Sequence, residues 1–158
     1  MLKNTLYSVT LGIALLSYGI STGFADSTNV VISSPDVIDG RTLEDDSGNL
    51  YRLYAVRTPS LDATCEDAKG ASYECGKRAQ RTLENYASGM LSCQKGGVDQ
   101  DGIHLVRCYD FANRDLGSRL VRAGWALPDR QVSQVYVFEE MEAEARKKGL
   151  WSGRFVIR

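Results

Sequence analysis

Four cysteines constrain the fold of this chain more than any other feature of its 158 residues. Nine residues separate Cys65 from Cys75, and fourteen separate Cys93 from Cys108. Structural zinc sites favour closely spaced cysteine pairs, so this spacing argues against a metal site. In a chain that folds in an oxidising compartment, four such thiols indicate two disulfides.

The amino-terminal residues predict export to such a compartment. Lys3 precedes the mostly apolar stretch Leu6–Ile20, and the small residues at Gly23–Ala25 provide a cleavage site, as in a secretory signal peptide. Polar residues near its end interrupt the apolar stretch, unlike a membrane helix of about 20 apolar residues. We therefore expect a signal peptide at 1–25 and a periplasmic or secreted domain at 26–158, with no later membrane span.

The charge of the processed chain argues against a nucleic-acid ligand. Removal of Lys3 from the 19 basic residues leaves 18 Lys and Arg against 20 Asp and Glu, a formal charge of −2. Nonspecific nucleic-acid binding draws most of its affinity from many basic contacts to phosphate. We expect nucleic-acid binding to be weak or absent.

The residue pattern predicts a mixed α+β domain. Short runs of strand-forming residues bounded by turn-formers predict strands at 29–33, 36–39, after Gly40, 50–56, 90–94 and 103–109. Apolar residues at helical spacing predict helices at 74–86, 115–123 and 133–148, and residues 57–73 look like a loop. We expect a small closed β-barrel of five strands with three α-helices.

Antiparallel pairing of the last two predicted strands would bring two cysteines together. Cys93 and Cys108 could then form a cross-strand disulfide, and Cys65 and Cys75 would close the loop before the first helix. We favour this pairing, although the sequence alone leaves the connectivity open.

In the third predicted helix, three residues four apart form the expected core face: Val137, Met141 and Ala145. The expected solvent face carries Glu139, Glu142 and Arg146.

Several motifs resemble the staphylococcal nuclease (thermonuclease) family. V-I-D-G-R-T at 37–42, R-L-Y-A-V-R-T-P-S at 52–60 and D-Q-D-G-I at 99–103 occur in the family's order, and residues 116–126 and 143–151 are similar to its second and closing helices. The cysteines are similar to those of its exported bacterial branch. The resemblance covers nearly all of the mature chain and implies an oligonucleotide-binding (OB) barrel of five strands with three helices.

The positions that match the family's catalytic residues are largely substituted. Active members hydrolyse phosphodiesters with a calcium ion held by two Asp, a Glu that activates water and two phosphate-binding Arg. Only Arg52 and Thr58 match that pattern, whereas the other positions carry Arg41, Arg57, Ser60 and Ile103. Arginine cannot supply the oxygen ligands that calcium needs, and a serine hydroxyl is no carboxylate base. The resemblance therefore implies a pseudoenzyme that has lost the calcium site and needs no cofactor.

The retained and substituted positions together bring three positive charges to one place. If Arg41, Arg52 and Arg57 converge as their counterparts do in the family, the cluster can bind an anion through guanidinium contacts. Such an anion could be phosphate, a sugar acid or the carboxylate of an envelope protein. The alternative is that nearby acids neutralise the arginines in a structural ion-pair network: Asp39, Glu44, Asp45 or Asp46.

The favoured function is thus a noncatalytic, monomeric binding module of the cell envelope. A weak or altered phosphodiesterase that acts on nucleic acid with a displaced acid, such as Asp62, is the alternative, and a purely structural subunit is a third. A pair of carboxylates within reach of Arg52 would favour the phosphodiesterase.

Other conspicuous residues have structural interpretations. His104 should lie on the strand face opposite the arginines, and Trp125 and Trp151 should pack against the barrel. The basic run 146–148 should be a solvated helix end.

Overall fold

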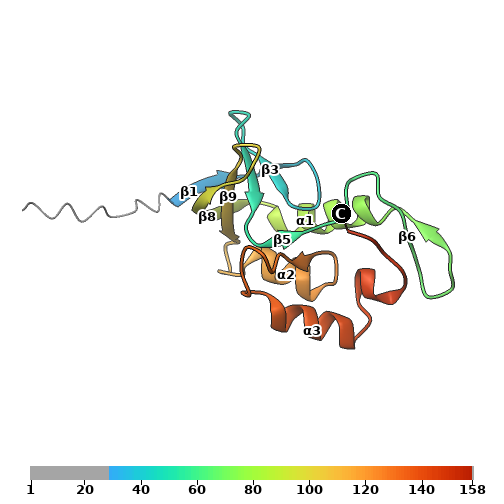
Figure 1. Cartoon of the computed structure of the whole chain (residues 1–158). Coiled ribbons are helices and arrows are strands. Elements are labelled where there is room, and N and C mark those ends of the chain that lie inside the picture. Colours follow the sequence, from blue (N-terminus) through green and yellow to red (C-terminus); the bar gives the residue numbers. More distant parts are fainter. Residues whose placement is uncertain (1–28, 158) are drawn as a thin grey trace, which may run out of the picture.

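A computed structural model of the protein describes residues 29–157 (Figure 1). The predicted signal peptide and its cleavage site lie outside the described residues. Within 29–157, no helix combines the length and apolar character needed to cross a membrane.

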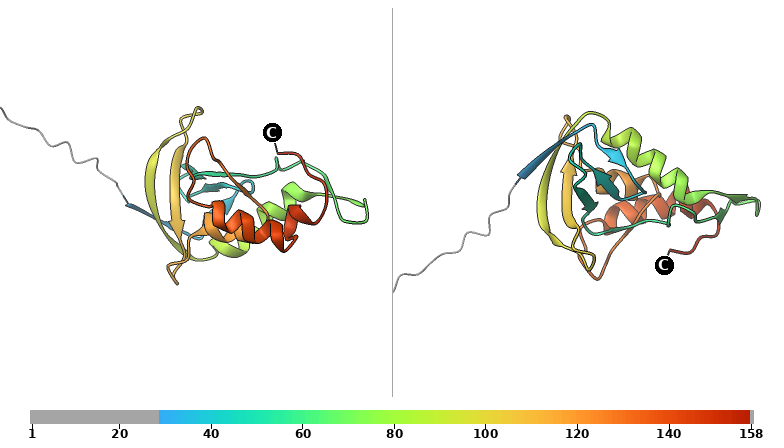
Figure 2. Two further views of the ribbon diagram at one scale, coloured as in Figure 1. Left: turned by 60° about the horizontal axis from the view of Figure 1, so that its bottom comes forward. Right: turned by 90° about the horizontal axis from the view of Figure 1, so that it is seen from above.

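The main sheet has six strands and curls into a half-barrel (Figure 2). Its spatial order is β1, β8, β9, β4, β3, β2, and only the β4–β9 pair is parallel. The strands are β1 (Asn29–Ser33), β2 (Asp36–Val37), β3 (Thr42–Glu44), β4 (Leu50–Leu53), β8 (Met90–Val98) and β9 (His104–Tyr109).

Three α-helices cover this sheet, in agreement with the predicted number. They are α1 (Cys75–Ala87), α2 (Leu116–Arg122) and α3 (Val137–Ala145), and a 3₁₀ helix, η1 (Gly149–Ser152), follows α3. Two further pairs of short strands complete the fold: β5 (Val56–Arg57) with β10 (Leu127–Pro128), and β6 (Cys65–Glu66) with β7 (Ser72–Tyr73).

The strands differ from the prediction in number and in bounds: the main sheet has six strands where five were expected, β8 continues to Val98 beyond the predicted end at residue 94, and β10 was not predicted. The predicted strand 50–56 ends at Leu53 because Ala55 adopts a left-handed φ of 57°, after which β5 leaves the main sheet and pairs with β10. The predicted loop 57–73 contains the β6–β7 hairpin, whose turn is held by Asp67. The Asp67 carboxylate accepts hydrogen bonds from the Lys69 and Ala71 N–H groups, a turn that strand periodicity alone does not reveal.

The core lies between the concave side of the sheet and the helices. Apolar side chains that are at most 1% exposed come from both layers: Ile32, Leu43, Leu53, Leu83, Leu91, Val106, Leu116, Leu120 and Val121. A second, smaller cluster contains Cys65, Cys75 and Leu150. Trp125 packs against both clusters, as expected, whereas Trp151 packs edge-on against Phe155 of the C-terminal segment rather than against the main core.

Both disulfides have the pairing that the sequence favoured. Cys93 and Cys108 are direct partners in the antiparallel β8–β9 register, with Cα atoms 4.0 Å apart. Cys65 and Cys75 join β6 to the start of α1, with Cα atoms 5.6 Å apart. The Cys93–Cys108 disulfide therefore ties two strands of the main sheet, and the Cys65–Cys75 disulfide fixes the loop that precedes α1.

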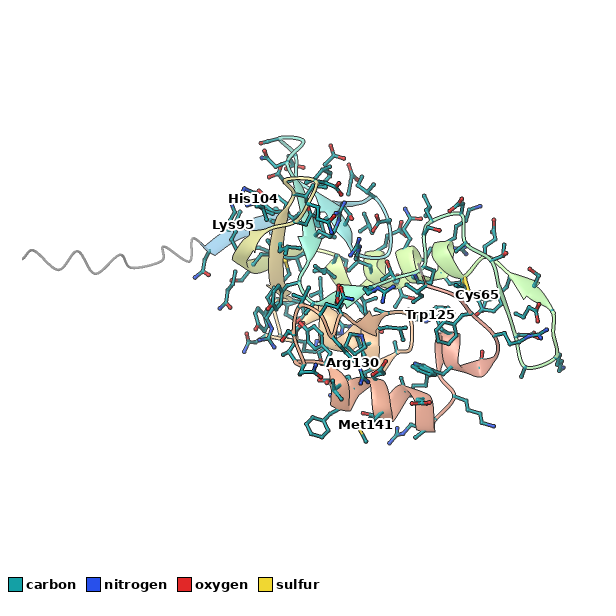
Figure 3. The ribbon with its side chains drawn as sticks, viewed as in Figure 1. Cys65, Lys95, His104, Trp125, Arg130 and Met141 are labelled. Atoms are coloured by element: carbon teal, nitrogen blue, oxygen red, sulfur yellow. A yellow bond between two sulfur atoms is a disulfide. The ribbon has the colours of Figure 1, made fainter. Side chains whose placement is uncertain are left out.

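The predicted third helix is wrong in its length and in its buried face. It spans 137–145 rather than 133–148. Met141 is exposed (Figure 3), and so is Ala145. Tyr136, Glu140 and Ala143 are buried instead.

Ion pairs explain why α3 turns its acidic side inward. Arg122 of α2 pairs with Glu139 at 3.4 Å and with Glu142 at 3.2 Å, and Ser118 donates a hydrogen bond to Glu139. The interface between α2 and α3 is therefore partly polar, which apolar periodicity cannot detect. Beyond the helix, Arg146 and Lys147 are exposed, as expected for the basic run, whereas Lys148 is partly buried and pairs with Glu142 at 3.5 Å.

Candidate functional site

A pocket of about 530 Å³ lies beside β4 and β5 and brings the three predicted arginines together. Arg41, Arg52, Arg57 and Thr58 all line it. Three carboxylates line the same pocket: Asp99, Asp101 and Asp129. The formal charges of these side chains cancel, so the arrangement of the pairs decides what the pocket can bind.

Arg41 is placed by a tight turn between β2 and β3. The Asp39 carboxylate accepts hydrogen bonds of 2.8 Å from the N–H groups of Arg41 and Thr42, and one of 3.0 Å from the Thr42 hydroxyl. A side chain at Gly40 would place Cβ 2.9 Å from that of Ala79 and 3.0 Å from that of Thr58. Glycine therefore lets this turn pack closely against α1, which fixes the position of Arg41.

The other two arginines come from successive strands. Arg52 lies on β4, opposite Thr42 of β3 and Leu105 of β9 in the register. Arg57 lies on β5, and its guanidinium donates to the Ile157 carbonyl at 3.2 Å. The chain changes direction between them at Ala55, so both side chains line the pocket.

Only one of the three guanidinium groups forms an ion pair within residues 29–157. Arg52 pairs with Asp99 and, at 3.0 Å, with Asp101. Arg41 makes one long hydrogen bond of 3.4 Å to the Val56 carbonyl, and Arg57 contacts only a carbonyl. Two cations of the pocket thus have no carboxylate partner among the described residues.

The electrostatic state of the arginines reflects this arrangement. Burial and the neighbouring Arg52 charge lower the pKa of Arg41, against the opposing effect of Asp39. The Nε atom of Arg52 is buried and has no hydrogen-bond acceptor among the described residues. A buried donor without an acceptor is costly, and an anion in the pocket could supply one.

The acids expected to neutralise the arginines do not do so. Within residues 29–157, Asp39, Glu44, Asp45 and Asp46 form no ion pair with the three arginines. Asp39 holds the β2–β3 turn, and Asp45 holds the β3–β4 turn by accepting hydrogen bonds from Ser47, Asn49 and Tyr51.

Asp99 and Asp101 line the pocket and pair with Arg52, a contact that the sequence did not predict. Both lie in the turn between β8 and β9, within the D-Q-D-G-I motif that the resemblance already marked. Hydrogen bonds from the Ile103 and Asp101 N–H groups and the charge of Arg52 lower the pKa of Asp99, although partial burial opposes them. The parallel β4–β9 pairing brings this turn to Arg52, and that pairing could not be predicted.

The remaining predicted positions lie outside the lining of the pocket. Ser60 and Asp62 are exposed, and the Ile103 N–H donates to Asp99. His104 is exposed (Figure 3). Its ring stacks on that of its register partner Tyr51, with centroids 6.4 Å apart, so it lies on the face opposite Arg52, as expected. Within residues 29–157, no three His, Cys, Asp or Glu side chains are grouped closely enough to hold a metal ion.

The comparisons with known proteins give one similarity. No family model matches the chain. It is similar to the succinoglycan biosynthesis protein ExoI of Rhizobium meliloti (strain 1021), with 29% identity over 145 residues. The alignment covers 90% of this chain and 75% of that protein, so it extends over most of both.

Proposed function

We propose that this protein is a noncatalytic anion-binding module with a staphylococcal nuclease-like OB barrel that acts outside the cytoplasm. The main support for this proposal is that Arg41 and Arg57 line one pocket with Arg52 and have no carboxylate partner in residues 29–157. Guanidinium groups suit carboxylate and phosphate because they donate several hydrogen bonds in a fixed plane. The curled sheet and three helices support the fold, and the two disulfides support an oxidising compartment.

The name of the similar protein suggests a class of ligand, because it assigns that protein to succinoglycan biosynthesis. A module with a related task would bind a glycan or a protein that handles one, and a glycan that carries acidic groups would fit the arginines. We therefore place sugar acids ahead of inorganic phosphate as ligands.

Isothermal titration with galacturonate, phosphate and sulfate tests the proposal. Arg41→Gln and Arg57→Gln should each weaken binding about tenfold, because a hydrogen bond to a charged group is worth about 1.5 kcal/mol or more. Arg81→Gln is the matched control, since Arg81 is exposed on α1 and does not line the pocket. Absence of anion-dependent heat, or an equal loss in the control, would overturn the proposal.

A weak phosphodiesterase remains the second candidate because two carboxylates, Asp99 and Asp101, do reach Arg52. The pKa of Asp99 is lowered by its backbone hydrogen bonds and by the charge of Arg52, against the opposing effect of burial, and this makes Asp99 a poor proton acceptor and favours binding over hydrolysis. Incubation with single-stranded DNA and RNA, in calcium or in chelator, separates the two functions. Calcium-dependent cleavage that is lost in Arg52→Ala and kept in Asp62→Asn would establish the enzyme.

A further inference from the structure

A second pocket of about 340 Å³ lies on the same face of the sheet as the arginine pocket. It is lined by Tyr54, Gln94, Lys95, Gly96 and Arg107. None of these residues occupies a position that matches a catalytic residue of the nuclease family. The pocket combines the aromatic ring of Tyr54, the amide of Gln94 and the guanidinium of Arg107, which is a set of groups suited to a polar, negatively charged ligand.

The strand register places the two pockets one after the other. In β9, Leu105 lines the first pocket and Arg107 the second, and residues two apart point to the same face at a spacing of roughly 7 Å. Arg52 and Tyr54 are also two residues apart. Tyr51 and Leu53, which alternate with them along the chain, are buried in the core, so Arg52 and Tyr54 point to the opposite face. The two pockets are therefore consecutive positions along one sheet face.

β8 continues this face on the other side of β9. Gln94 is the direct partner of Arg107 in the antiparallel register. A Cβ atom at Gly96 would lie 3.7 Å from a ring carbon of Tyr54 and would meet no closer atom. The missing side chain at this exposed position thus leaves the Tyr54 ring accessible across β9.

The cations of the second pocket differ in how they are held. The Arg107 Nε atom donates to Asp115 at 2.6 Å, which fixes the guanidinium while its side chain stays 39% exposed. The Lys95 ammonium lies 5.8 Å from the centre of the Tyr51 ring, on the face opposite Gln94 and Arg107, because Lys95 is the register partner of the buried Val106. The second pocket therefore offers one fixed positive charge, on Arg107.

We infer that the two pockets are adjacent subsites for an acidic oligosaccharide of at least two sugar units. This inference rests on the proposed anion-binding function of the first pocket and extends it to a chain. One unit places its carboxylate on Arg41, Arg52 and Arg57. The next unit packs against Tyr54 and places its polar groups on Gln94 and Arg107.

The carboxylates of the first pocket favour a sugar chain over a nucleic acid. Asp99, Asp101 and Asp129 are acceptors when ionised, and sugar hydroxyls are donors that can bind them. An oligogalacturonate and a phosphodiester chain both carry one negative charge per unit, so charge does not distinguish them. Each galacturonate unit also carries free hydroxyl donors, whereas the backbone of DNA carries none within the chain, and this difference favours the sugar chain.

A chain-length series tests the inference with the full processed protein. Affinity for galacturonic acid, digalacturonate and trigalacturonate is measured by titration, and we expect the oligomers to bind at least tenfold more tightly than the monomer. Gly96→Leu should remove this gain and leave monomer binding unchanged, because the new side chain fills the second pocket alone. Ser92→Leu is the matched control, since Ser92 is an exposed β8 residue outside both pockets.

The outcomes separate this inference from the proposed function. Monomer binding with no gain for the oligomers, or a gain that survives in Gly96→Leu, overturns the second subsite and leaves the proposed function intact. If neither the monomer nor the oligomers bind to the wild-type protein, both the proposed function and the second subsite are overturned. Tighter binding of a short oligothymidylate than of trigalacturonate overturns the sugar class. Thermal melting of each variant confirms that it is folded.

Discussion

The Asp101 carboxylate accepts a hydrogen bond of 3.0 Å from the Arg52 guanidinium, although 68% of the Asp101 side chain is exposed. Asp99 binds the same guanidinium from a more buried position, with 15% of its side chain exposed. The two carboxylates therefore play different parts: Asp99 positions Arg52, and Asp101 covers a face of it that an anion could use.

Replacing Asp101 with asparagine should strengthen anion binding. The substitution removes a negative charge from the pocket and frees a donor of Arg52, which should increase the affinity for galacturonate about two- to fivefold, or by about 0.5–1 kcal/mol. Stability should change little because ion pairs this exposed contribute about 0–1 kcal/mol. Titration and thermal melting measure both effects. Asp62→Asn removes an exposed charge outside the pocket and should leave the affinity unchanged; an unaltered affinity in Asp101→Asn would contradict the argument.

The β3–β4 turn should contribute to the acid sensitivity of the fold. Hydrogen bonds from the side chain and backbone of Asn49, with others from Tyr51 and Ser47, lower the pKa of Asp45 to about 2. A carboxyl group whose pKa is depressed in the folded state stabilises that state fully above its unfolded pKa of about 3.9 and loses this effect as the pH falls toward 2.

Carboxyl NMR titration should accordingly find an Asp45 midpoint near 2. Urea unfolding of Asp45→Asn should show a shallower fall in stability between pH 4 and pH 2 than the wild type. Asp46→Asn is the control, because Asp46 is exposed and forms no hydrogen bond within the described residues. An Asp45 midpoint near 4 would contradict the role of the turn.

The two disulfides should differ in which part of the molecule they hold. Cys93 and Cys108 are fully buried in the main core, whereas Cys65 and Cys75 belong to the smaller cluster with Leu150. Loop-closure entropy predicts a loss of about 3 kcal/mol in the free energy of unfolding when either bridge is removed. Hydrogen exchange should distinguish the two double Cys→Ala variants.

Removal of Cys93–Cys108 should accelerate exchange throughout β8 and β9 and so reach the second pocket. Removal of Cys65–Cys75 should accelerate exchange mainly in β6, β7 and η1, and should spare the arginine pocket. Equal loss of protection over the whole domain in both variants would show that the two clusters unfold as one unit.

Local signals predicted much of this structure, and long-range pairing limited the rest. α1, α2 and the β8–β9 hairpin follow from periodicity and turn residues, which act over a few residues, and the predicted hairpin favoured the disulfide pairing that the structure has. The convergence of Arg41, Arg52 and Arg57 came from the family resemblance. The Arg52–Asp99 ion pair joins residues 47 apart through the parallel β4–β9 register, and no local pattern encodes that register.

The prediction of the buried face of α3 failed for a different reason, because the apolar pattern indicated the wrong face. Val137, Met141 and Ala145 have helical spacing, yet the helix packs through Ala143 and through acidic residues that pair with Arg122. Apolar periodicity identifies a buried face only where burial is apolar, and here ion pairs hold part of the interface.

Substitutions on the two sides of α3 should therefore have effects opposite to those the apolar pattern predicts. Phe138 is 82% exposed and Met141 58% exposed, so Phe138→Ser and Met141→Lys should change the free energy of unfolding by less than about 0.5 kcal/mol. Ala143 is fully buried, and Ala143→Leu should lower the free energy of unfolding by about 1–3 kcal/mol because the core must expand. Urea unfolding of the three variants measures these differences. A loss of 2 kcal/mol or more in Met141→Lys, with little effect of Ala143→Leu, would restore the face that periodicity indicated and would place Glu139 and Glu142 in solvent.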